Sequence, residues 1–487
     1  MTLRPSVHPS TVIQSGDFVT PLANVLASRA VSTNVEKTDT STIECLSARL
    51  LDALAIIGSG DRSTTASIAR DYLRMARNFD TEVSLSLPDL GDLSLEDAGF
   101  LLGGYAFSQN FADTSLPAVT HPGSVVIPAL LVAGMAQPVS GLDGLSAIAA
   151  GYDAMEVTGR ALNGNPRMGH QIRGFRPTAT CGPIAAVVTI GRAWRMSESQ
   201  IANGICLAAN HGGGLRRHSG GEAGSIRLQS AEAVRRGVAA LLQSQAGLEA
   251  SPTMLEGDGG FFAAYQSESL DAAALDLADR SLFAAAHESA AKIHCVAHTI
   301  VPVLDGLLEL VLRNELKPDD VEKIECLVPH EHAIISVPGL HENARVGGSY
   351  ELACAVVLAN GDYIWPDEAA RGVSSLTREL ASKVTVQGDD EMSHAFRSDV
   401  MSWPAQVVVT TKSGETLTAK RDAPDTLGYS PKVRDLIARK AAVLGSAIGV
   451  PDMSANLWSA VSKLPTETSV WDAIRTALPK HDVRSGS

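Results

Sequence analysis

Apolar residues recur at helical spacing through most of this chain. The clearest series lies between residues 43 and 57, at Ile43, Leu46, Leu50, Leu51, Leu54 and Ile57. Steps of three and four residues place such side chains on one face of an α-helix. Aromatic residues make up only 5% of the sequence, whereas alanine and glycine abound, and small side chains favour closely packed helices over a β-sandwich. The sequence therefore predicts a mainly α-helical protein.

The pattern changes near residue 285 and changes back near residue 423. Segments rich in β-formers occur at 317–328, 384–386, 406–411 and 416–420, with helical segments between them. Because 487 residues exceed one average core, we expect two domains. The predicted organisation is a disordered lead-in at 1–18, a helical domain built from 19–285 and 423–487, and an α+β domain at 286–422.

Charge and composition argue against several classes of function. The formal net charge is −14, which disfavours nucleic acid as a partner, although a local basic pocket can still bind an acidic substrate. No segment reaches the ~18 uninterrupted apolar residues of a membrane span, and the first 18 residues hold no apolar signal core. The six cysteines are scattered without a CxxC pair, as is typical of reduced thiols. We expect a cytoplasmic protein that binds neither nucleic acid nor membrane.

The stretch Gly174–Gly182, GFRPTATCG, is the first candidate site. An apolar helical run follows it at Pro183, and the free N–H groups of a helix N-terminus suit an anion. Arg176 adds a planar guanidinium that matches a carboxylate, and Thr178 adds a hydroxyl. The stretch predicts a site for a small carboxylic acid. On spacing alone, an ordinary loop before a core helix is an equally good interpretation.

The loop 111–121, FADTSLPAVTH, is the second candidate. It contains Asp113 and Thr114 and ends at His121, directly before Pro122 and an apolar helical run. A histidine in this place can act as a general acid or base. It can equally be a helix cap or a satisfied loop histidine, which spacing alone favours.

Two further segments carry groups that can move protons. The segment KIHCVAH contains Lys292, His294 and His298, and the two histidines stand four residues apart, as on one helix face. Without an HExxH pattern this spacing is a weak indication of a metal site. Tyr350 precedes an apolar helix, where it would either donate to an oxyanion or cap a core. The glycine-rich loop at 212–225 lacks the Walker pattern, so it is either a gate over a pocket or a plain connector.

Taken together, these motifs resemble the MmgE/PrpD family, which includes 2-methylcitrate dehydratase, cis-aconitate decarboxylase and iminodisuccinate epimerase. The likeness rests on five motifs in the same order, and it spans about residues 20 to 480: FADTSLPAVTH, GFRPTATCG, GDGGFFAAY, KIHCVAH followed by Asp305, and Ser349-Tyr350. It implies a helical domain built from both chain ends, an inserted α+β lid and an active site between them. It also implies a homodimer and catalysis without metal or organic cofactor.

The resemblance also implies roles for individual residues. It places the loop aspartate of the family at Asp113, the first catalytic histidine at His121, the lid lysine at Lys292 and the tyrosine at Tyr350. Such enzymes remove a proton beside a carboxylate and must stabilise the anion that results. Beyond the resemblance, we expect five residues to bind the substrate: Arg176, Arg227, Thr114, Thr178 and His298.

Two positions depart from the family pattern. The family usually has histidine where this chain has Arg176, and it usually has lysine where this chain has Ile226. Arginine is no general base at neutral pH, and isoleucine moves no protons. Either the proton transfers rest on His121, Lys292 and Tyr350, or the reaction differs. His298 and the basic cluster at 216–218 are candidate replacements.

Three hypotheses follow. The first is a lyase that dehydrates a citrate-like or alkylcitrate acid, with His121 as acid or base, Lys292 and Tyr350 as proton donors, and arginines on the carboxylates. The second is a decarboxylase or an epimerase on the same scaffold. The third is a non-catalytic binding or dimer partner that has kept the fold.

Overall fold

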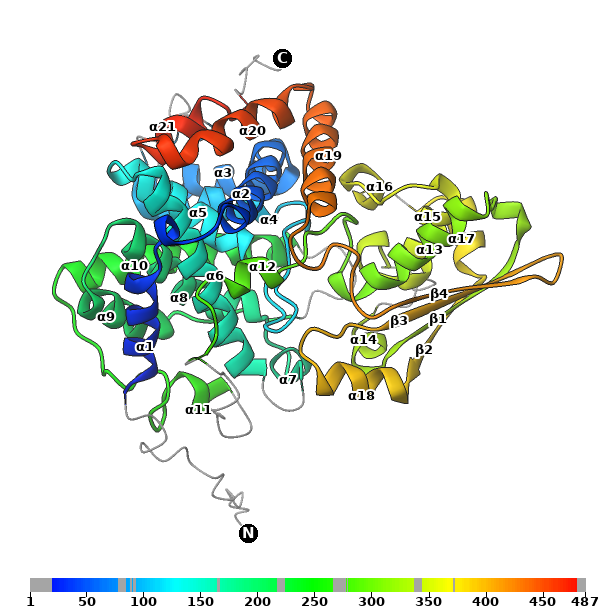
Figure 1. Cartoon of the computed structure of the whole chain (residues 1–487), viewed down its shortest axis with the longest axis horizontal. Helices are drawn as coiled ribbons and strands as arrows, with labels where there is room; N and C mark the ends of the chain where they lie inside the picture. Colours follow the sequence, from blue (N-terminus) through cyan, green and yellow to red (C-terminus); the bar gives the residue numbers. More distant parts are fainter. Residues whose placement is uncertain are drawn as a thin grey trace, which may run out of the picture.

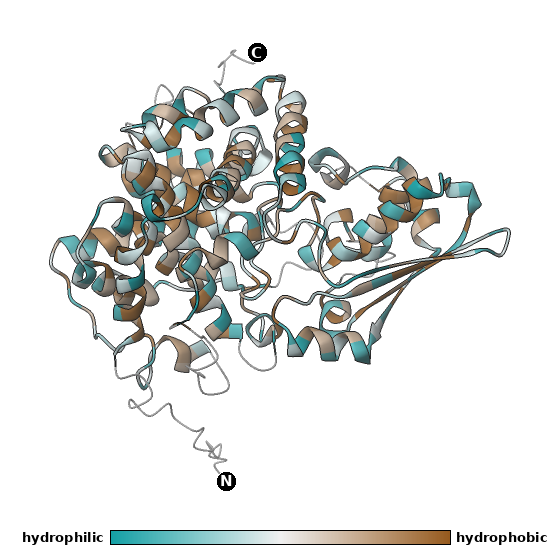
Figure 2. Cartoon of the chain, viewed as in Figure 1, coloured by the Kyte–Doolittle hydropathy of each residue, from teal (hydrophilic) through white to brown (hydrophobic). Residues whose placement is uncertain are grey.

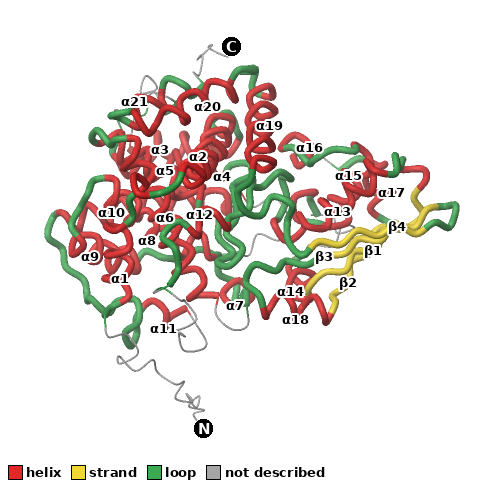
Figure 3. The backbone as a smooth tube through the Cα atoms, in the orientation of Figure 1, coloured by secondary structure: helices red, strands yellow, loops and turns green. Residues whose placement is uncertain are grey.

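The structure is a computed structural model, and it describes residues 20–77, 85–87, 90, 93–163, 167–216, 224–265, 277, 279–336, 344–370 and 373–479. The predicted lead-in at 1–18 lies outside these residues, as do Arg217 and His218 of the basic cluster. The described chain is mainly α-helical and forms a large helical part and a smaller part that carries a sheet (Figure 1, Figure 3).

The helical part is assembled from both ends of the chain, and in Figure 1 the late helices α19, α20 and α21 cover the early ones. Its N-terminal helices are α1 (Leu22–Ser32), α2 (Thr40–Gly60), α3 (Thr64–Arg77), α4 (Leu95–Phe107), α5 (Gly123–Ala136), α6 (Gly141–Asn163), α7 (Gly169–Ile172), α8 (Pro177–Ala193), α9 (Glu198–Ala209), α10 (Gln229–Gln245), α11 (Phe261–Tyr265) and α12 (Ala284–Glu288). Its C-terminal helices are α19 (Pro431–Ala447), α20 (Met453–Lys463) and α21 (Val470–Arg475).

Helix α8 lies at the centre of this part and is buried along its whole length. It packs against α5, α6, α9 and α10. The close packing of these helices requires small residues where they meet. A Cβ on Gly182 would come within 2.6 Å of the Cβ of Ala233, and a Cβ on Gly151 would come within 2.1 Å of Thr189 Oγ1. The apolar interior is visible in Figure 2.

The smaller part contains a four-stranded mixed sheet of order β2-β1-β3-β4. Its strands are β1 (Val321–Pro329), β2 (Val384–Asp389), β3 (Ala405–Thr411) and β4 (Thr416–Arg421). β1 and β2 are parallel, whereas β1 and β3, and β3 and β4, are antiparallel. All four strands fall in segments where the sequence predicted them.

Helices cover both faces of this sheet (Figure 1). The helices that contact its strands are α13 (Val301–Arg313), α14 (His330–Ile335), α15 (Tyr350–Asn360) and α18 (Asp390–Ser398). Helix α17 (Ser375–Ala381) packs on α15, and α16 (Pro366–Ala370) packs on the turn η6 (Val346–Gly348). Buried and half-buried residues alternate along β3, so Val407 and Val409 face the core that α13 and α15 close. This core takes its residues from 296–419, while the main core takes its residues from both chain ends. The predicted boundaries at 285/286 and 422/423 stay a prediction, and we call the sheet-bearing part the lid.

One predicted element begins at a different residue. The sequence placed a helix start at Pro183, but α8 begins at Pro177 with Arg176 as its N-cap residue. Proline suits the first helical position, where its missing N–H would have no intrahelical partner. Gly174 takes the left-handed conformation at φ 98° and turns the chain into this start. The N-terminus of this helix therefore lies at Pro177, six residues before the expected start.

No helix among the described residues is both long and apolar enough to cross a membrane.

Candidate active site

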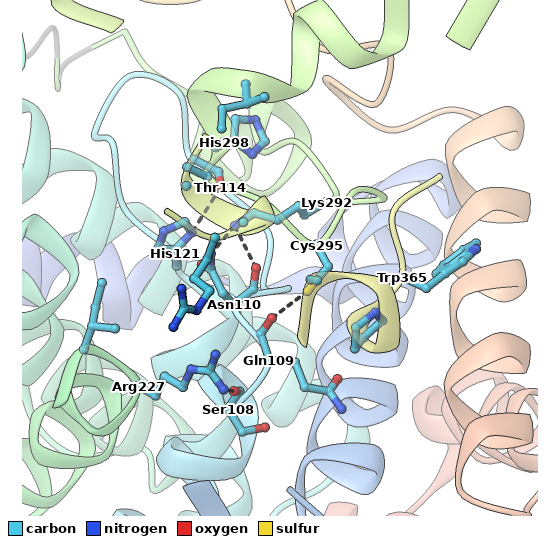
Figure 4. A pocket seen from close by; sticks show the side chains of 18 of the residues that line it. Ser108, Gln109, Asn110, Thr114, His121, Arg227, Lys292, Cys295, His298 and Trp365 are labelled. Carbon is cyan, nitrogen blue, oxygen red and sulfur yellow. Dashed lines mark hydrogen bonds between the residues drawn. The ribbon is translucent and has the colours of Figure 1, made fainter. Parts of the chain in front are cut away.

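A cavity of about 970 Å³ lies between the helical part and the lid. The helical part contributes the loop after α4, the start of α8, the 3-10 turn η2 (Gly224–Leu228), and α19. The lid contributes the segment 297–300 and α16. Of the nine residues to which the sequence analysis assigned catalytic or substrate-binding roles, six line this cavity: Thr114, His121, Arg176, Arg227, Lys292 and His298. Figure 4 shows how these elements converge.

His121 is held in one ring orientation. Its Nδ1 lies 2.9 Å from the carbonyl oxygen of Asp113 and 3.1 Å from Thr114 Oγ1. A carbonyl can only accept, so the proton sits on Nδ1 and the lone pair of Nε2 is left for the cavity. The backbone N–H of His121 donates to Thr178 Oγ1 at 3.1 Å. These contacts prepare His121 to accept a proton through Nε2.

The electrostatic surroundings keep His121 neutral. Burial lowers the pKa of His121 well below 6.5, and the positive charges of Lys292 and Arg176 lower the pKa further. A cationic imidazole would be poorly solvated here and repelled by both neighbours. At neutral pH the ring is therefore a base rather than an acid.

Asp113 and Thr178 act on His121 from behind and do not line the cavity. The Asp113 carboxylate accepts from the Gly123 N–H at 2.8 Å and from the Tyr152 hydroxyl at 2.7 Å. Burial raises the pKa of Asp113. Both side chains are bonded within the protein beside His121 and its loop, and the catalytic role expected for Asp113 and the substrate contact expected for Thr178 stay predictions.

Lys292 is fully buried, and its Nζ faces the loop after α4. Nζ donates to the backbone oxygen of Asn110 at 3.1 Å and lies 3.4 Å from its Oδ1. Burial lowers the pKa of Lys292 to about 7, helped by the positive charges of Lys440 and Arg176. A lysine with this pKa exchanges protons at neutral pH, as general acid catalysis requires.

Arg176 presents a guanidinium to the cavity with one nitrogen unpaired. Its Nη1 donates to the Ile226 carbonyl at 2.8 Å, and the group lies 4.2 Å from the centre of the Phe107 ring. Its Nη2 is buried and has no hydrogen-bond partner among the described residues. Burial without a carboxylate partner lowers the pKa of Arg176 to about 9. A substrate carboxylate would satisfy Nη2, since a buried unpaired donor is costly.

Arg227 lies nearby on η2 and donates through Nη1 to the Ser108 carbonyl at 2.8 Å. Arg176 and Arg227 thus enter the cavity from two different elements. Both are held by backbone carbonyls, so their positive charge is not neutralised by these contacts. The expected carboxylate-binding roles of the two arginines stay proposals that this geometry favours.

His298 is one of the lid residues that line the cavity. Its ring packs edge-on against Trp403 with 5.5 Å between ring centres, and neither ring nitrogen has a hydrogen-bond partner among the described residues. Burial, Lys292 and His332 lower the pKa of His298 well below 6.5. A neutral imidazole with two unpaired nitrogens can donate to one oxygen and accept from another.

Tyr350 does not line the cavity, and the catalytic role expected for it stays a prediction. Its hydroxyl donates to the Thr299 carbonyl at 2.8 Å, and the whole side chain is buried in the lid core. Burial raises the pKa of Tyr350 far above 10. The bond anchors the turn η4 (His298–Ile300), so Tyr350 positions His298 from behind.

The positive charge of the cavity exceeds what sequence reasoning found. Six cationic side chains among the described residues line it: Arg62, Arg176, Arg216, Arg227, Lys292 and Arg345. Asp367 is the one described carboxylate among the lining residues. Arg345 could have been suspected, because it directly precedes the segment that ends in Ser349-Tyr350. Nothing local marks Arg62, which the packing of α2 against α19 brings to the cavity. A net positive cavity in a chain of net charge −14 selects for anions.

The metal interpretation of His294 gains no support from the geometry. His294 Nδ1 accepts from the Ile364 N–H at 3.2 Å, and its Nε2 lies 3.5 Å from Asp305 Oδ1. It does not line the cavity beside His298. Within the described ranges, no three His, Cys, Asp or Glu side chains are grouped to hold a metal ion.

Fold and cavity define a mainly α, two-domain protein with a cationic site where its helical domain meets an α+β lid. Residues 24–272 match the MmgE/PrpD N-terminal domain, and residues 294–464 match the MmgE/PrpD C-terminal domain. The chain therefore belongs to the MmgE/PrpD family, as the sequence motifs indicated. Membership supports a lyase type of activity at the level of the family. No curated protein matches the chain.

Proposed function

We propose that this protein is a lyase that dehydrates a citrate-like hydroxy acid of the 2-methylcitrate or alkylcitrate type. One observation carries the proposal: His121, a neutral base, and Lys292, whose pKa is about 7, share a cavity lined by six cations and one described carboxylate. Base, acid and carboxylate-binding groups are the parts that loss of water beside a carboxylate requires.

The reaction begins with binding of the substrate carboxylates. Arg176 Nη2 takes one carboxylate, and Arg227 contributes to a second. Nε2 of His121 then removes the proton from the carbon beside a carboxylate, and the electron pair of that C–H bond enters the carboxylate. Arg176 stabilises the charge that accumulates on its oxygens, as fixed donors do in a cavity of low dielectric.

The leaving hydroxyl departs with a proton. The ammonium of Lys292 supplies it, so the C–O bond breaks, a C=C bond forms and water leaves. His121 then holds one extra proton and Lys292 lacks one, and transfer between them or through solvent restores both groups. His298 offers one donor and one acceptor to the remaining polar groups of the substrate.

The same groups could serve two other reactions of the family scaffold. A decarboxylase would protonate carbon after CO2 leaves, and an epimerase would use His121 and Lys292 on opposite faces of one carbon. A binding partner without chemistry would need neither a neutral histidine nor a lysine with a lowered pKa, so that alternative is the least supported.

The test is turnover of a panel of acids followed by NMR in D2O. The panel contains citrate, 2-methylcitrate, cis-aconitate, itaconate and iminodisuccinate. We expect loss of water from a citrate-type acid, with deuterium in the recovered substrate at the carbon beside the carboxylate. Release of CO2, or exchange with inversion and without elimination, would move the assignment to decarboxylase or epimerase. Binding by thermal shift without deuterium uptake would contradict any enzymatic assignment.

The remaining expectations rest on the family resemblance and stay proposals. They are a homodimer, a cytoplasmic location, and catalysis without metal or organic cofactor. Light scattering after gel filtration measures the oligomeric state. Turnover before and after dialysis against a chelator tests the expectation of catalysis without a metal. We expect turnover to persist, and its loss on chelation would contradict that expectation.

A further inference from the structure

The lid side of the cavity holds a polar cluster that the proposed reaction uses only in part. It consists of His298 from the turn η4, Ser336 directly after α14, and Trp403, two residues before β3, and all three line the cavity. The rings of Trp403 and His298 lie 5.5 Å apart, centre to centre. In Figure 4 His298 and Arg227 lie at opposite ends of the labelled groups, with His121 between them. We call these three residues the lid cluster.

Four buried polar atoms of the lid cluster have no hydrogen-bond partner among the described residues. They are the indole nitrogen Nε1 of Trp403, both ring nitrogens of His298, and Oγ of Ser336. Trp365 also lines the cavity, but its Nε1 donates to Asp362 at 3.3 Å. A buried donor without an acceptor is costly, so we expect a ligand atom to accept from the Trp403 N–H.

The Trp403 ring is fixed in place by its neighbours. It packs with Leu116 and Val119 from the loop that leads to His121, and it lies 4.9 Å from the ring of His332. Val119 also lines the cavity, and it holds the left-handed conformation at φ 54°. That conformation is strained for a β-branched residue and persists only where the surrounding structure imposes it. The loop that Trp403 packs against is therefore preorganised, as a binding site requires.

The lid cluster carries no charge at neutral pH. Serine and tryptophan are uncharged, and burial lowers the pKa of His298 well below 6.5, helped by the positive charge of Lys292. The apolar side chains of Val119 and Ile335 line the cavity and pack beside Trp403. A carboxylate here would lose its hydration and meet no charged group of the cluster, whereas an uncharged hydroxyl needs only hydrogen bonds.

A hydroxyl matches the lid cluster group by group. The Trp403 N–H can only donate, and a neutral His298 has one nitrogen that donates and one that accepts. A hydroxyl oxygen can accept from Trp403 while its own proton is donated to the accepting nitrogen of His298. The charge of Lys292 lowers the pKa of both His121 and His298, so Lys292 lies close to both rings. A hydroxyl bound here would lie beside the acid that the proposed reaction needs.

We propose that Trp403 selects hydroxy acids by donating its indole N–H to the hydroxyl that leaves as water, with His298 completing this subsite. The inference rests on the proposed function for the leaving of the hydroxyl, and on the unpaired atoms of the lid cluster for its binding. Loss of this one donor should weaken the binding of a hydroxy acid roughly tenfold.

The experiment compares citrate with tricarballylate, which has the same carboxylates and lacks only the hydroxyl. Dissociation constants are measured by titration calorimetry in the cold, where turnover is slow, for the wild-type chain, Trp403→Phe and the control Trp365→Phe. We expect the wild type to bind citrate roughly tenfold more tightly than tricarballylate. Trp403→Phe should abolish most of this preference by weakening citrate alone. Trp365→Phe should keep the preference, because the N–H that it removes is bonded to the protein.

The outcomes separate this inference from the proposed reaction. If Trp403→Phe removes the preference while no acid of the panel is dehydrated, the subsite stands and the proposed reaction fails. If dehydration is observed but the preference is absent in the wild type or survives in Trp403→Phe, the reaction stands and the subsite is overturned. Equal weakening of both acids by Trp403→Phe would assign a carboxylate to this place, which also overturns it. Should Trp403→Phe fail to fold, His298→Phe is the second variant and must remove the same preference.

Discussion

Arg176 donates through Nη1 to the carbonyl oxygen of Ile226 at 2.8 Å, so the two positions at which this chain departs from the pattern of its family are in direct contact. The family usually has a histidine and a lysine there, whereas this chain has a guanidinium and an apolar side chain. The two differences are therefore one local exchange in which Arg176 keeps a positive charge at the site. The proposed reaction accordingly assigns proton transfer to His121 and Lys292.

Arg176→Met tests the carboxylate contact. Removing a charged hydrogen-bond donor should raise KM roughly ten- to hundredfold, measured by steady-state kinetics on the acid identified above. Arg475→Met, on the exposed helix α21, is the matched control and should leave KM unchanged. Because residues 176 and 226 touch, Arg176→His combined with Ile226→Lys should recover more activity than the single changes predict. If the effects of the two substitutions on activity simply add, the interpretation of residues 176 and 226 as one coupled exchange is wrong.

The pH dependence of kcat/KM should be bell-shaped with an optimum on the acid side of neutral. His121 must be neutral, so activity rises with pH through the lowered pKa of His121, below 6.5. Lys292 must be protonated, so activity falls as pH passes the Lys292 pKa of about 7. Lys292→Arg keeps its proton and should move the alkaline limb upward by two or more pH units at reduced activity. An alkaline limb that does not move would exclude Lys292 as the acid.

Lys292→Met should stabilise the fold while abolishing turnover. The folded-state pKa of about 7 lies below the ordinary 10.5, so the unfolded chain binds more protons between these values. The charged lysine therefore destabilises the fold most below pH 7, and this cost fades as pH rises toward 10.5. We expect a gain in the free energy of unfolding on the order of a few kcal/mol at pH 6, shrinking by pH 10, in urea titrations. A lower free energy of unfolding at pH 6 for Lys292→Met than for the wild type would contradict this prediction.

Tyr350→Phe separates a positioning role from a catalytic one. The variant loses the bond to the Thr299 carbonyl, which should lower the free energy of unfolding by about 1 kcal/mol. Activity should fall less than tenfold, mainly through KM, because His298 is less well placed. A fall in kcat of a thousandfold with an unchanged Tm would restore Tyr350 to the chemistry.

Arg167→Met should loosen the lid. The Arg167 guanidinium donates to Leu116 in the helical domain at 3.0 Å, and to the carbonyls of Phe396, Asp399, Val400 and Ser402 in the lid. It also stacks 4.1 Å from the Phe396 ring. Its loss leaves several carbonyls unpaired and should cost roughly 3 kcal/mol of unfolding free energy. Hydrogen exchange should rise across 396–403, whereas the exposed control Arg313→Met should change neither quantity.

Much of the fold was predictable because it depends on local patterns. Apolar periodicity predicted the helices, and β-branched runs predicted β1 to β4 close to their observed bounds. The start of α8 was missed, because two prolines compete for it and only packing decides that Pro183 lies inside the helix. At the site, the sequence named His121, Lys292 and Arg176 as candidates.

What could be predicted from the sequence, and what could not, depends on how far apart in the chain the interacting residues are. The sequence by itself determined the helical character, the α+β segment, the family and the types of group available for chemistry, since these depend on residue identity and near neighbours. The tertiary structure alone decided which groups face the cavity. Asp113 and Tyr350 carry suitable side chains, but each is bonded within the protein to partners at least ten residues away. The tertiary structure also decided the pKa of Lys292. Burial among cations that are distant in the sequence sets how well the Lys292 charge is solvated.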